Sequence, residues 1–487
     1  MTTLDTTTLD PPAAGTPPPG PATVLRGRAL GRFLGQLVRN HDQLAALSFL
    51  PSGSGLVTIP APGTHVVIVR HPAHARHLLV SNQQTFVKGL DYKILAVLLG
   101  KGLLTNDDHE DWQQQRARVL PRFARRHLTP MGTHMTDAAG DWLDRLDRDH
   151  RDGDELDLSA AMMGLTLDVV GRALFGANIS EQDTRAVGRA MTTVLDGAGA
   201  SFNMVGVYRV LSKIRGVEFE DLLQIRVRHW RRAMKAIPVL DDVVDRLIDA
   251  KVAAGSEGDD LLALLLQARD EQGGGAMPRQ QVRDEVMTFL GAGHETTANA
   301  MSWMWMLLSQ FPEARVRMEA EVDEVLQGRR PTFADLAQLP WTNAVFHEAM
   351  RLHPPVPAFS RVAAADDVVD GTRIRKGSVL LVMPYLIHRD PELWPNPEGF
   401  DPERFMPGAG SGRHKQAFMP FGGGRHICVG QGFALMEGVL LAAMTVQRFR
   451  FDLLRGSKIE REVAITARPR GGMPVQLRRR TGAPAVE

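Results

Sequence analysis

The sequence predicts a mainly α-helical protein with one long central helix and small β-sheets. Two observations lead to this fold class. Residues 278–311 form the most apolar helical pattern of the chain, and they lie near its middle. Alternating strand patterns occur only at residues 56–70 and again late, at residues 362–369 and 378–382. Because strands and helices do not alternate as in a doubly wound sheet, we expect one α-rich domain with β regions at its two ends.

Composition narrows the class further. Hydrophobic residues make up 44% of the 487 positions and charged residues 23%, as in soluble globular proteins. The formal net charge of +1 gives no reason to expect nucleic acid as a partner. Cys428 is the single cysteine, which excludes an internal disulfide framework and fits a reducing cytoplasm.

The N-terminus differs from the rest. Residues 1–25 are rich in proline and lack the basic and apolar regions of a signal peptide, so we predict a disordered leader before a domain at 26–487. No stretch approaches ~18 uninterrupted apolar residues, so no transmembrane anchor is expected.

The helical part is predicted from its patterns in chain order. An amphipathic helix is expected at 26–47, followed by a hairpin of strands at 56–59 and 64–70. Residues 198–217 are rich in glycine and are expected to be a mobile apolar connection that acts as a lid. Further helices are expected at 108–120, 157–175, 181–195 and 218–254, the last with a break at Pro238.

The stretch Phe421-Gly-Gly-Gly-Arg-His-Ile-Cys-Val-Gly430 places the lone cysteine before an apolar helix at 431–444. Consecutive glycines allow positive φ values and close approach of a flat ligand. A helix N-terminus favours a thiolate, and a thiolate is a good axial ligand for haem iron. A buried core cysteine is the other interpretation that Cys428 alone allows.

A second candidate is Ala292-Gly-His-Glu-Thr-Thr297, in the middle of the central helix. Buried polar groups are costly unless they face a cavity or water, and Gly293 would open space against the backbone. A groove with a hydroxyl and a carboxyl beside it could hold dioxygen and deliver protons. The alternative is a polar stripe toward another helix.

A third candidate is Glu348-Ala-Met-Arg351, whose acid and base lie on one helix face and can pair. Exposed pairs of this spacing are common and contribute little. The following Leu352-His-Pro-Pro-Val-Pro357 ends the helix, and Arg404 is a possible third member of a buried charge network.

Together, in this order and spacing, these segments resemble the cytochrome P-450 superfamily of haem-thiolate monooxygenases, of the soluble bacterial type. Its cysteine pattern, Phe-x-x-Gly-x-(Arg or His)-x-Cys-x-Gly, is met by the segment from Phe421 to Gly430. Its oxygen-activating helix pattern is met by the segment from Ala292 to Thr297, and its Glu-x-x-Arg pair by Glu348 and Arg351. The similarity covers roughly residue 26 to the end.

The resemblance implies a role for each matched residue. Cys428 would be the proximal thiolate of haem b (iron protoporphyrin IX), within a cofactor-binding loop from Phe421 to Gly430. Thr296, with Glu295, would deliver protons for cleavage of the O–O bond. Glu348, Arg351 and Arg404 would be structural. The haem propionates would be contacted by Trp112, Arg116, Arg361 and His426, where His426 replaces the commoner arginine.

The predicted function is insertion of one oxygen atom of O2 into a lipophilic substrate, by hydroxylation or epoxidation. Electrons would come from NAD(P)H through a separate ferredoxin or flavin reductase, because 487 residues leave no room for a fused reductase. A basic cluster could attract such an acidic partner or be a solvated face; its members are Arg116, Arg118, Arg122, Arg125 and Arg126. Two rivals stay open: a peroxide-dependent or rearranging haem-thiolate enzyme, and a non-catalytic haem-binding protein.

The substrate is not specified by the sequence. The candidate pocket residues are small to medium and mostly apolar: Phe289, Ala292, Val356, Ala358, Phe359 and Thr466. Fatty acids, terpenes and other lipids are all compatible with such a lining.

Overall fold

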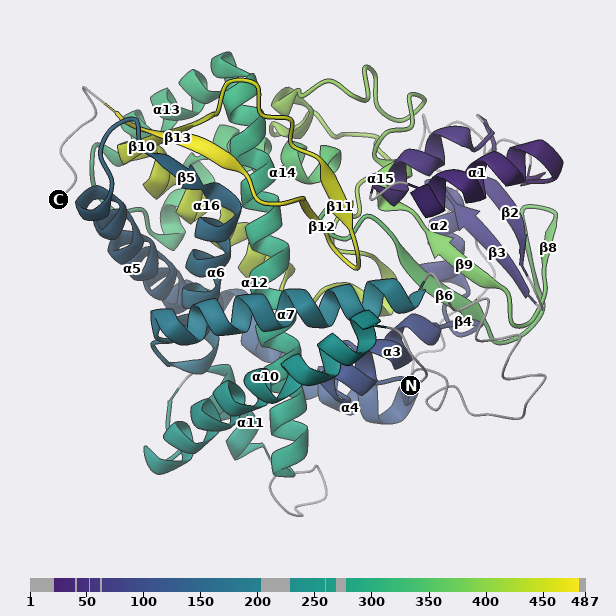
Figure 1. Ribbon diagram of the computed structural model, residues 1–487, viewed down its shortest axis with the longest axis horizontal. Coiled ribbons are helices and arrows are strands. Elements are labelled where there is room, and N and C mark those ends of the chain that lie inside the picture. Colours follow the sequence, from purple (N-terminus) through teal and green to yellow (C-terminus); the bar gives the residue numbers. More distant parts are fainter. Residues whose placement is uncertain are drawn as a thin grey trace.

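Helices dominate the chain, and the predicted central helix runs through its middle as α12 (Arg279–Gln310) (Figure 1). The computed structural model describes residues 22–39, 42–51, 53–61, 64–202, 228–258, 260–268 and 277–480. Most of the predicted leader and most of the predicted lid, residues 203–217, lie outside these residues. The mainly helical fold class is confirmed.

The other elements surround α12. The α-helices are α1 (Gly27–Arg39), α2 (Pro72–Arg76), α3 (Leu90–Leu99), α4 (His109–Val119), α5 (Arg125–Asp149), α6 (Leu158–Phe175), α7 (Glu181–Phe202), α10 (Arg228–Ala253), α11 (Leu261–Gln267), α13 (Pro312–Leu326), α14 (Pro340–Leu352), α15 (Pro384–Ile387) and α16 (Gln431–Arg448). Short 3-10 or π turns are η1 (Gln43–Phe49), η2 (His77–Ser81), η3 (Leu120–Phe123), η4 (Phe333–Gln338), η5 (Pro402–Phe405) and η6 (Gly424–His426).

Four small sheets occur in the part of the chain that the structure describes. The largest has the order β1-β2-β3-β9-β6-β4, with β1 (Thr23–Val24), β2 (Leu56–Ala61), β3 (Thr64–Val69), β9 (Val379–Val382), β6 (Phe359–Ala363) and β4 (Phe86–Val87). A second has the order β10-β13-β5, with β10 (Phe449–Leu453), β13 (Pro474–Arg479) and β5 (Glu155–Asp157). Two hairpins are β7 (Asp367–Val369) with β8 (Thr372–Ile374), and β11 (Arg461–Val463) with β12 (Ala467–Pro469).

The two predicted β regions meet in one sheet, except that the predicted strand at 362–369 is divided: β6 ends at Ala363, and Asp367–Val369 form β7 in a separate hairpin. The hairpin of β2 and β3 forms as expected, and β3 then pairs in parallel with β9, matching Val69 with Val382. The sequence suggested separate regions because hydrophobic alternation reveals strands but not their partners. This sheet lies to one side of the helical body (Figure 1).

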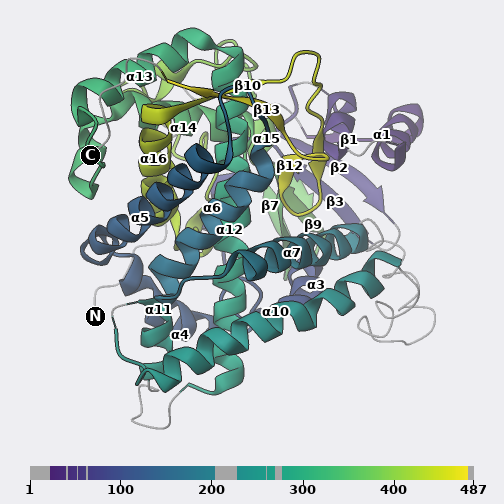
Figure 2. The same ribbon diagram turned by 60° about the vertical axis from the view of Figure 1, so that its left-hand side comes forward.

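Helix α12 is buried along most of its length because other helices enclose it. Helices α6, α10, α14 and α16 pack against it, and α7 and α10 lie side by side across the molecule in both views (Figure 2). Among the described helices, only α6 is long and apolar enough to cross a membrane, and 67% of it is buried inside the protein. Its apolar surface is therefore explained by packing in the core.

Helix starts agree with the sequence where a side chain caps the helix. Asp108 accepts hydrogen bonds from the backbone N–H groups of Glu110 and Asp111, and α4 begins at the next residue. Asp157 caps α6 in the same way. These boundaries are local properties, since an N-cap carboxylate satisfies the free N–H groups of the first turn.

Three helix predictions were wrong in extent. Helix α10 continues through Pro238 instead of breaking there. Proline has no N–H to bond the carbonyl of Met234 four residues earlier, but both residues are exposed, so water can bond this carbonyl. Buried residues of α10 hold the helix against α7. Helix α7 runs to Phe202 instead of ending at Leu195, because Gly197 lets Ala233 of α10 pack closely and does not break the helix. Helix α1 ends at Arg39, eight residues before the predicted end.

Candidate active site

The loop that carries Cys428 is shaped by two glycines. Gly422 and Gly424 have φ values of 73° and 67°, whereas Gly423 is extended, so two of the three glycines use the predicted freedom. A Cβ at Gly424 would overlap the backbone carbonyl of Leu79 in η2. The loop then closes through the N–H of Cys428, which donates to the carbonyl of Phe421 at 3.0 Å. The loop therefore presents Cys428 three residues before the first residue of α16.

Cys428 is accessible to solvent, but its thiol lies in an environment that changes its pKa. The residue is exposed, yet burial raises the pKa of the thiol, opposed by a hydrogen bond from the backbone of Gly430 and by the charge of Arg116. Arg116 is held beside the loop by its hydrogen bond to the carbonyl of Ile427, at 3.1 Å. A metal cation at the sulfur would favour the thiolate, and these two groups would stabilise that charge.

The middle of α12 has one accessible face. Ala292 is exposed and Thr296 half-buried, although Gly291, Glu295 and Thr297 beside them are buried. The hydroxyl of Thr296 donates to the carbonyl of Ala292 at 2.7 Å. The expected space at Gly293 is filled instead, because a methyl group of Val170 lies 3.0 Å from where a Cβ would be.

An aromatic cluster joins α12 to the cysteine loop. Phe289 of α12 stacks on Phe123 of η3 with 5.7 Å between ring centres, and Phe123 meets Phe433 of α16 edge-on at 6.4 Å. Phe123 also lies 4.0 Å from the position of a Cβ at Gly430. The predicted pocket residue Phe289 thus lies close to the loop of Cys428.

The carboxyl of Glu295 is buried next to the accessible face of α12. It accepts a short hydrogen bond from the hydroxyl of Thr466, and its Oε2 has no partner among the described residues. Burial raises the pKa of Glu295, partly offset by Thr466 and by the charge of Arg468. Arg468 in turn pairs with Asp196 of α7. The structure therefore places Thr466 as the partner of Glu295, where the sequence predicted a pocket residue.

The other predicted pocket residues lie between α14 and β6. Val356, Ala358 and Phe359 are half-buried. Ala358 and Phe359 pack against two different hydrophobic clusters, on either side of the large sheet. Their side chains offer apolar contacts and no charge.

Several cations converge near the cysteine loop without carboxylate partners. Arg361 is buried and donates to the carbonyl of Ser360 at 2.7 Å and to the hydroxyl of Tyr92 at 3.2 Å. Burial and the charge of Arg361 lower the pKa of Lys88 to about 7. Burial, then the charges of Arg361 and Lys88, lower the pKa of His426 to about 2. We call the set of Lys88, Arg116, Arg361, Arg425 and His426 the cation cluster.

The cation cluster fits a haem. In the part of the chain that the structure describes, none of its members forms an ion pair within 4.0 Å. Buried like charges are unfavourable without a counter-charge, and two carboxylates of a bound ligand would supply it. The donor set therefore matches the propionates of a haem whose iron would face the thiol.

Sequence reasoning found Arg116, Arg361 and His426 of this cluster but did not single out Arg425 within the cysteine loop. It also missed Lys88 and Tyr92, the hydroxyl partner of Arg361. No motif marks them, because they approach Arg361 only through the pairing of β4 with β6 and the packing of α3. Trp112 also differs from the expectation. Its ring lies 4.1 Å from that of His426, but its N–H donates to the carbonyl of Leu103 at 3.1 Å.

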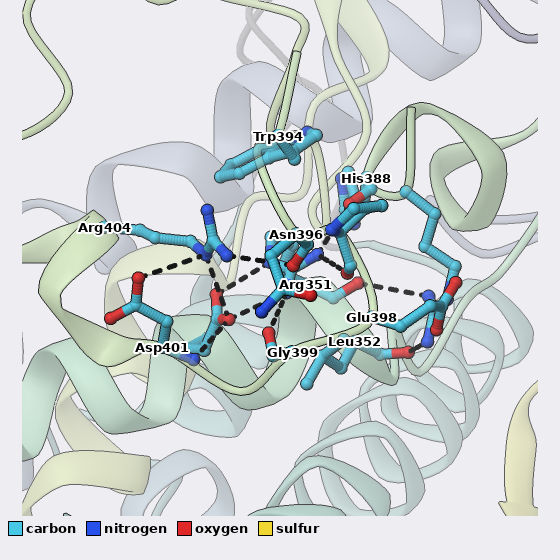
Figure 3. A network of polar contacts seen from close by, with 12 residues as sticks. Arg351, Leu352, His388, Trp394, Asn396, Glu398, Gly399, Asp401 and Arg404 are labelled. Carbon is cyan, nitrogen blue, oxygen red and sulfur yellow. Dashed lines mark hydrogen bonds and ion pairs between the residues drawn. The ribbon is translucent and has the colours of Figure 1, made fainter. Parts of the chain in front are cut away.

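The predicted charge network of Glu348, Arg351 and Arg404 is formed, and within it all charged groups of Arg351 and Glu348 have partners, whereas Nε of Arg404 has no hydrogen-bond partner among the described residues (Figure 3). Arg351 binds both carboxylate oxygens of Glu348 at 2.7 Å, and both residues are fully buried. Glu348 also accepts the N–H of Asp401 at 2.9 Å, and Arg404 lies 3.4 Å away. The remaining N–H groups of Arg351 donate to backbone carbonyls, those of His388, Pro397 and Gly399.

The basic cluster on α4, η3 and the start of α5 lies near the cysteine loop. Arg116 and Arg118 are half-buried, and Arg125 and Arg126 are exposed. The N–H of Arg126 donates to His127, and Arg125 lies 5.4 Å from the ring centre of Phe333.

The fold and the site fit the class of helical haem proteins, and comparison with known proteins names the family. The cytochrome P450 family model matches residues 43–471. Cytochrome P450 132 of Mycobacterium tuberculosis is 39% identical over 88% of this chain and 91% of its own. Two proteins of Streptomyces melanosporofaciens are also similar. Cyclooctatin synthase is 34% identical over 89% of this chain and 91% of its own. Cyclooctat-9-en-7-ol 5-monooxygenase is 32% identical over 85% of this chain and 86% of its own.

The chain therefore belongs to the cytochrome P450 family. It is a haem-containing cytochrome P450 monooxygenase, which uses dioxygen, an organic substrate and a redox partner.

Proposed function

We propose that the protein binds haem b through Cys428 and oxygenates a lipophilic substrate, by hydroxylation or epoxidation. The cation cluster is the observation that carries this proposal, since its charges form no ion pairs within 4.0 Å among the described residues and lie beside the accessible thiol. Bound haem supplies the iron and electron chemistry that activates dioxygen. Lys88, Arg116, Arg361 and His426 would bind its propionates, and Gly430 and Arg116 would stabilise the thiolate. Glu348, Arg351 and Arg404 would keep the surrounding segments in place.

Proton delivery is proposed for two residues of α12. The hydroxyl of Thr296 lies on the accessible face, where it can donate to a ligand instead of to Ala292. The carboxyl of Glu295 is held by Thr466 on one oxygen, so its proton would reside on the unpaired Oε2. Burial raises the pKa of Glu295, which keeps this proton available at higher pH than for an exposed glutamate.

The substrate is proposed to be an apolar hydrocarbon skeleton. Phe289, Ala292, Val356, Ala358 and Phe359 would provide an uncharged lining. Relatives named for cyclooctat-9-en-7-ol and for pentalenene support an alkene or its alcohol as substrate.

The redox partner is proposed to be a separate acidic protein, a ferredoxin or a flavin reductase. The basic cluster, with Arg118, Arg125 and Arg126 near the surface beside the cysteine loop, would attract it. We propose a cytoplasmic location, which the single cysteine supports.

The ferrous–carbon monoxide spectrum tests this proposal. The wild-type protein should show the far-red Soret band of a thiolate-bound haem, and Cys428→Ala should lose it. An unchanged spectrum in Cys428→Ala would refute the proposal. Turnover with peroxide but not with NAD(P)H and a reductase would instead favour a peroxide-dependent enzyme. Candidate substrates can be screened separately, by the spin-state shift that their binding causes in the haem spectrum.

A further inference from the structure

Residues 100–106, here called the strap, are attached to α12 by two adjacent carboxylates. The N–H of Lys101 donates to Asp284 at 2.8 Å, and the N–H of Leu103 donates to Oε2 of Glu285 at 3.1 Å. Gly100, with φ at 84°, is needed for this approach because a Cβ there would overlap the carboxylate of Asp284. The strap therefore lies directly on the helix that carries Thr296.

The far side of Leu103 faces the cation cluster. Its carbonyl accepts hydrogen bonds from Nζ of Lys88 at 3.2 Å and from the indole N–H of Trp112 at 3.1 Å. Lys88 also donates to the carbonyl of Asn106 at 2.7 Å. One residue of the strap thus connects the buried carboxylate of Glu285 with the ammonium group of Lys88.

Charge connects the same two groups. Glu285 is fully buried, and its Oε1 has no partner in the described part of the chain. The charged groups that face it are Asp284 on the same helix, Asp111 on α4 and Lys88. Burial raises the pKa of Glu285 to about 7, which the N–H of Leu103 and the charge of Lys88 oppose.

The pKa of Lys88 depends in turn on the charge of Glu285. The groups that face it are Arg361 of β6, Asp107, Glu285 and His426 of the cysteine loop. Burial and Arg361 lower the pKa of Lys88, whereas Asp107 and Glu285 raise it. Removal of the negative charge at Glu285 would therefore make Lys88 lose its proton at a lower pH.

We propose that Glu285 is a positioning residue for haem binding, which keeps Lys88 charged and in place through the Leu103 segment of the strap. The inference rests on the proposed binding of the haem propionates by the cation cluster. It assigns to a buried acid on the oxygen-activating helix a role on the propionate side of the haem. Ionised Glu285 then favours haem retention at the pH where Lys88 would otherwise be neutral.

The rate of haem loss from the ferric holoprotein to excess apomyoglobin, measured from about pH 6 to pH 9, tests the proposal. Haem loss should accelerate as Lys88 loses its proton, so the rate should rise with pH. Glu285→Gln keeps an acceptor for the N–H of Leu103 but removes the charge, so the rise should move to lower pH by about half to one unit. Lys88→Arg, whose charge does not titrate in this range, should abolish the rise with or without Glu285→Gln.

Asp284→Asn is the matched control. It removes the neighbouring carboxylate from the strap, and because the charge of Asp284 raises the pKa of Glu285, its loss favours ionised Glu285. The rise should therefore not move to lower pH, as it does in Glu285→Gln, and any shift should be to higher pH. An equal shift in Asp284→Asn and Glu285→Gln, or an unshifted rise in Glu285→Gln, would refute the inference. If Glu285→Gln does not fold, the single variant Lys88→Arg still tests the inference. A rate of haem loss that continues to rise with pH in this variant would refute it. Loss of the thiolate spectrum in the wild-type protein would instead refute the proposed function.

Discussion

The Glu348–Arg351–Arg404 network and the cation cluster both bury arginine, but among the described residues only the arginine of the network forms an ion pair with an acid. Arg351 meets the two oxygens of Glu348 and three backbone carbonyls, so its charge and its N–H groups are satisfied within the protein. Arg361 meets one carbonyl and one hydroxyl, and its neighbours Lys88 and His426 are shifted toward their neutral forms. The difference supports the proposed roles, in which the paired charges of the network stabilise the fold and the charges of the cation cluster bind a ligand.

This contrast predicts the largest stability effect at Arg351. Arg351→Met leaves Glu348 buried without a counter-charge, so the free energy of unfolding of the apoprotein should fall by about 3–5 kcal/mol. Urea unfolding followed by circular dichroism measures the effect. The double variant Glu348→Gln/Arg351→Met should recover part of the loss. If it does not, the cost comes from packing and not from the unpaired charge.

Replacing Arg361 should stabilise the apoprotein but weaken the holoprotein, so the sign of the effect should depend on whether haem is bound. Arg361→Met removes a buried cation whose acidic neighbour Asp91 forms no ion pair with it, so the apoprotein should gain about 1 kcal/mol in its free energy of unfolding. The holoprotein should lose haem roughly ten times faster, since a charged hydrogen bond to a propionate is absent. Unfolding without haem and transfer of haem to apomyoglobin measure the two effects. A fall in both quantities would assign Arg361 to the fold, like Arg351.

The exposed ion pair of Arg185 and Glu181 should have the smallest effect on stability in this comparison. Arg185 and Glu181 lie 3.2 Å apart on α7 with side chains 64% and 68% exposed. Arg185→Ala should change the free energy of unfolding by less than about 0.5 kcal/mol and leave haem loss unchanged. A larger change would mean that charge pairing on this surface cannot be ranked by burial.

The sequence by itself determined the features that depend on neighbours along the chain. The apolar runs predicted α12 and α16, the aspartates at 108 and 157 marked the starts of α4 and α6, and the pattern from Phe421 to Gly430 identified the cysteine loop. Each depends on capping, periodicity or backbone freedom within a few residues, which a sequence displays directly.

Only the tertiary structure decided which distant residues meet. It paired β3 with β9, carried α10 through Pro238, and gave Thr466 to Glu295. It also brought Lys88, Arg361 and His426 together, and joined them to Glu285 through Leu103. A lysine after a short strand and a glutamate on an apolar helix look ordinary in sequence. Their pKa values depend on burial and on charges that lie hundreds of residues away, so the roles proposed for these two residues could be inferred only from the packing.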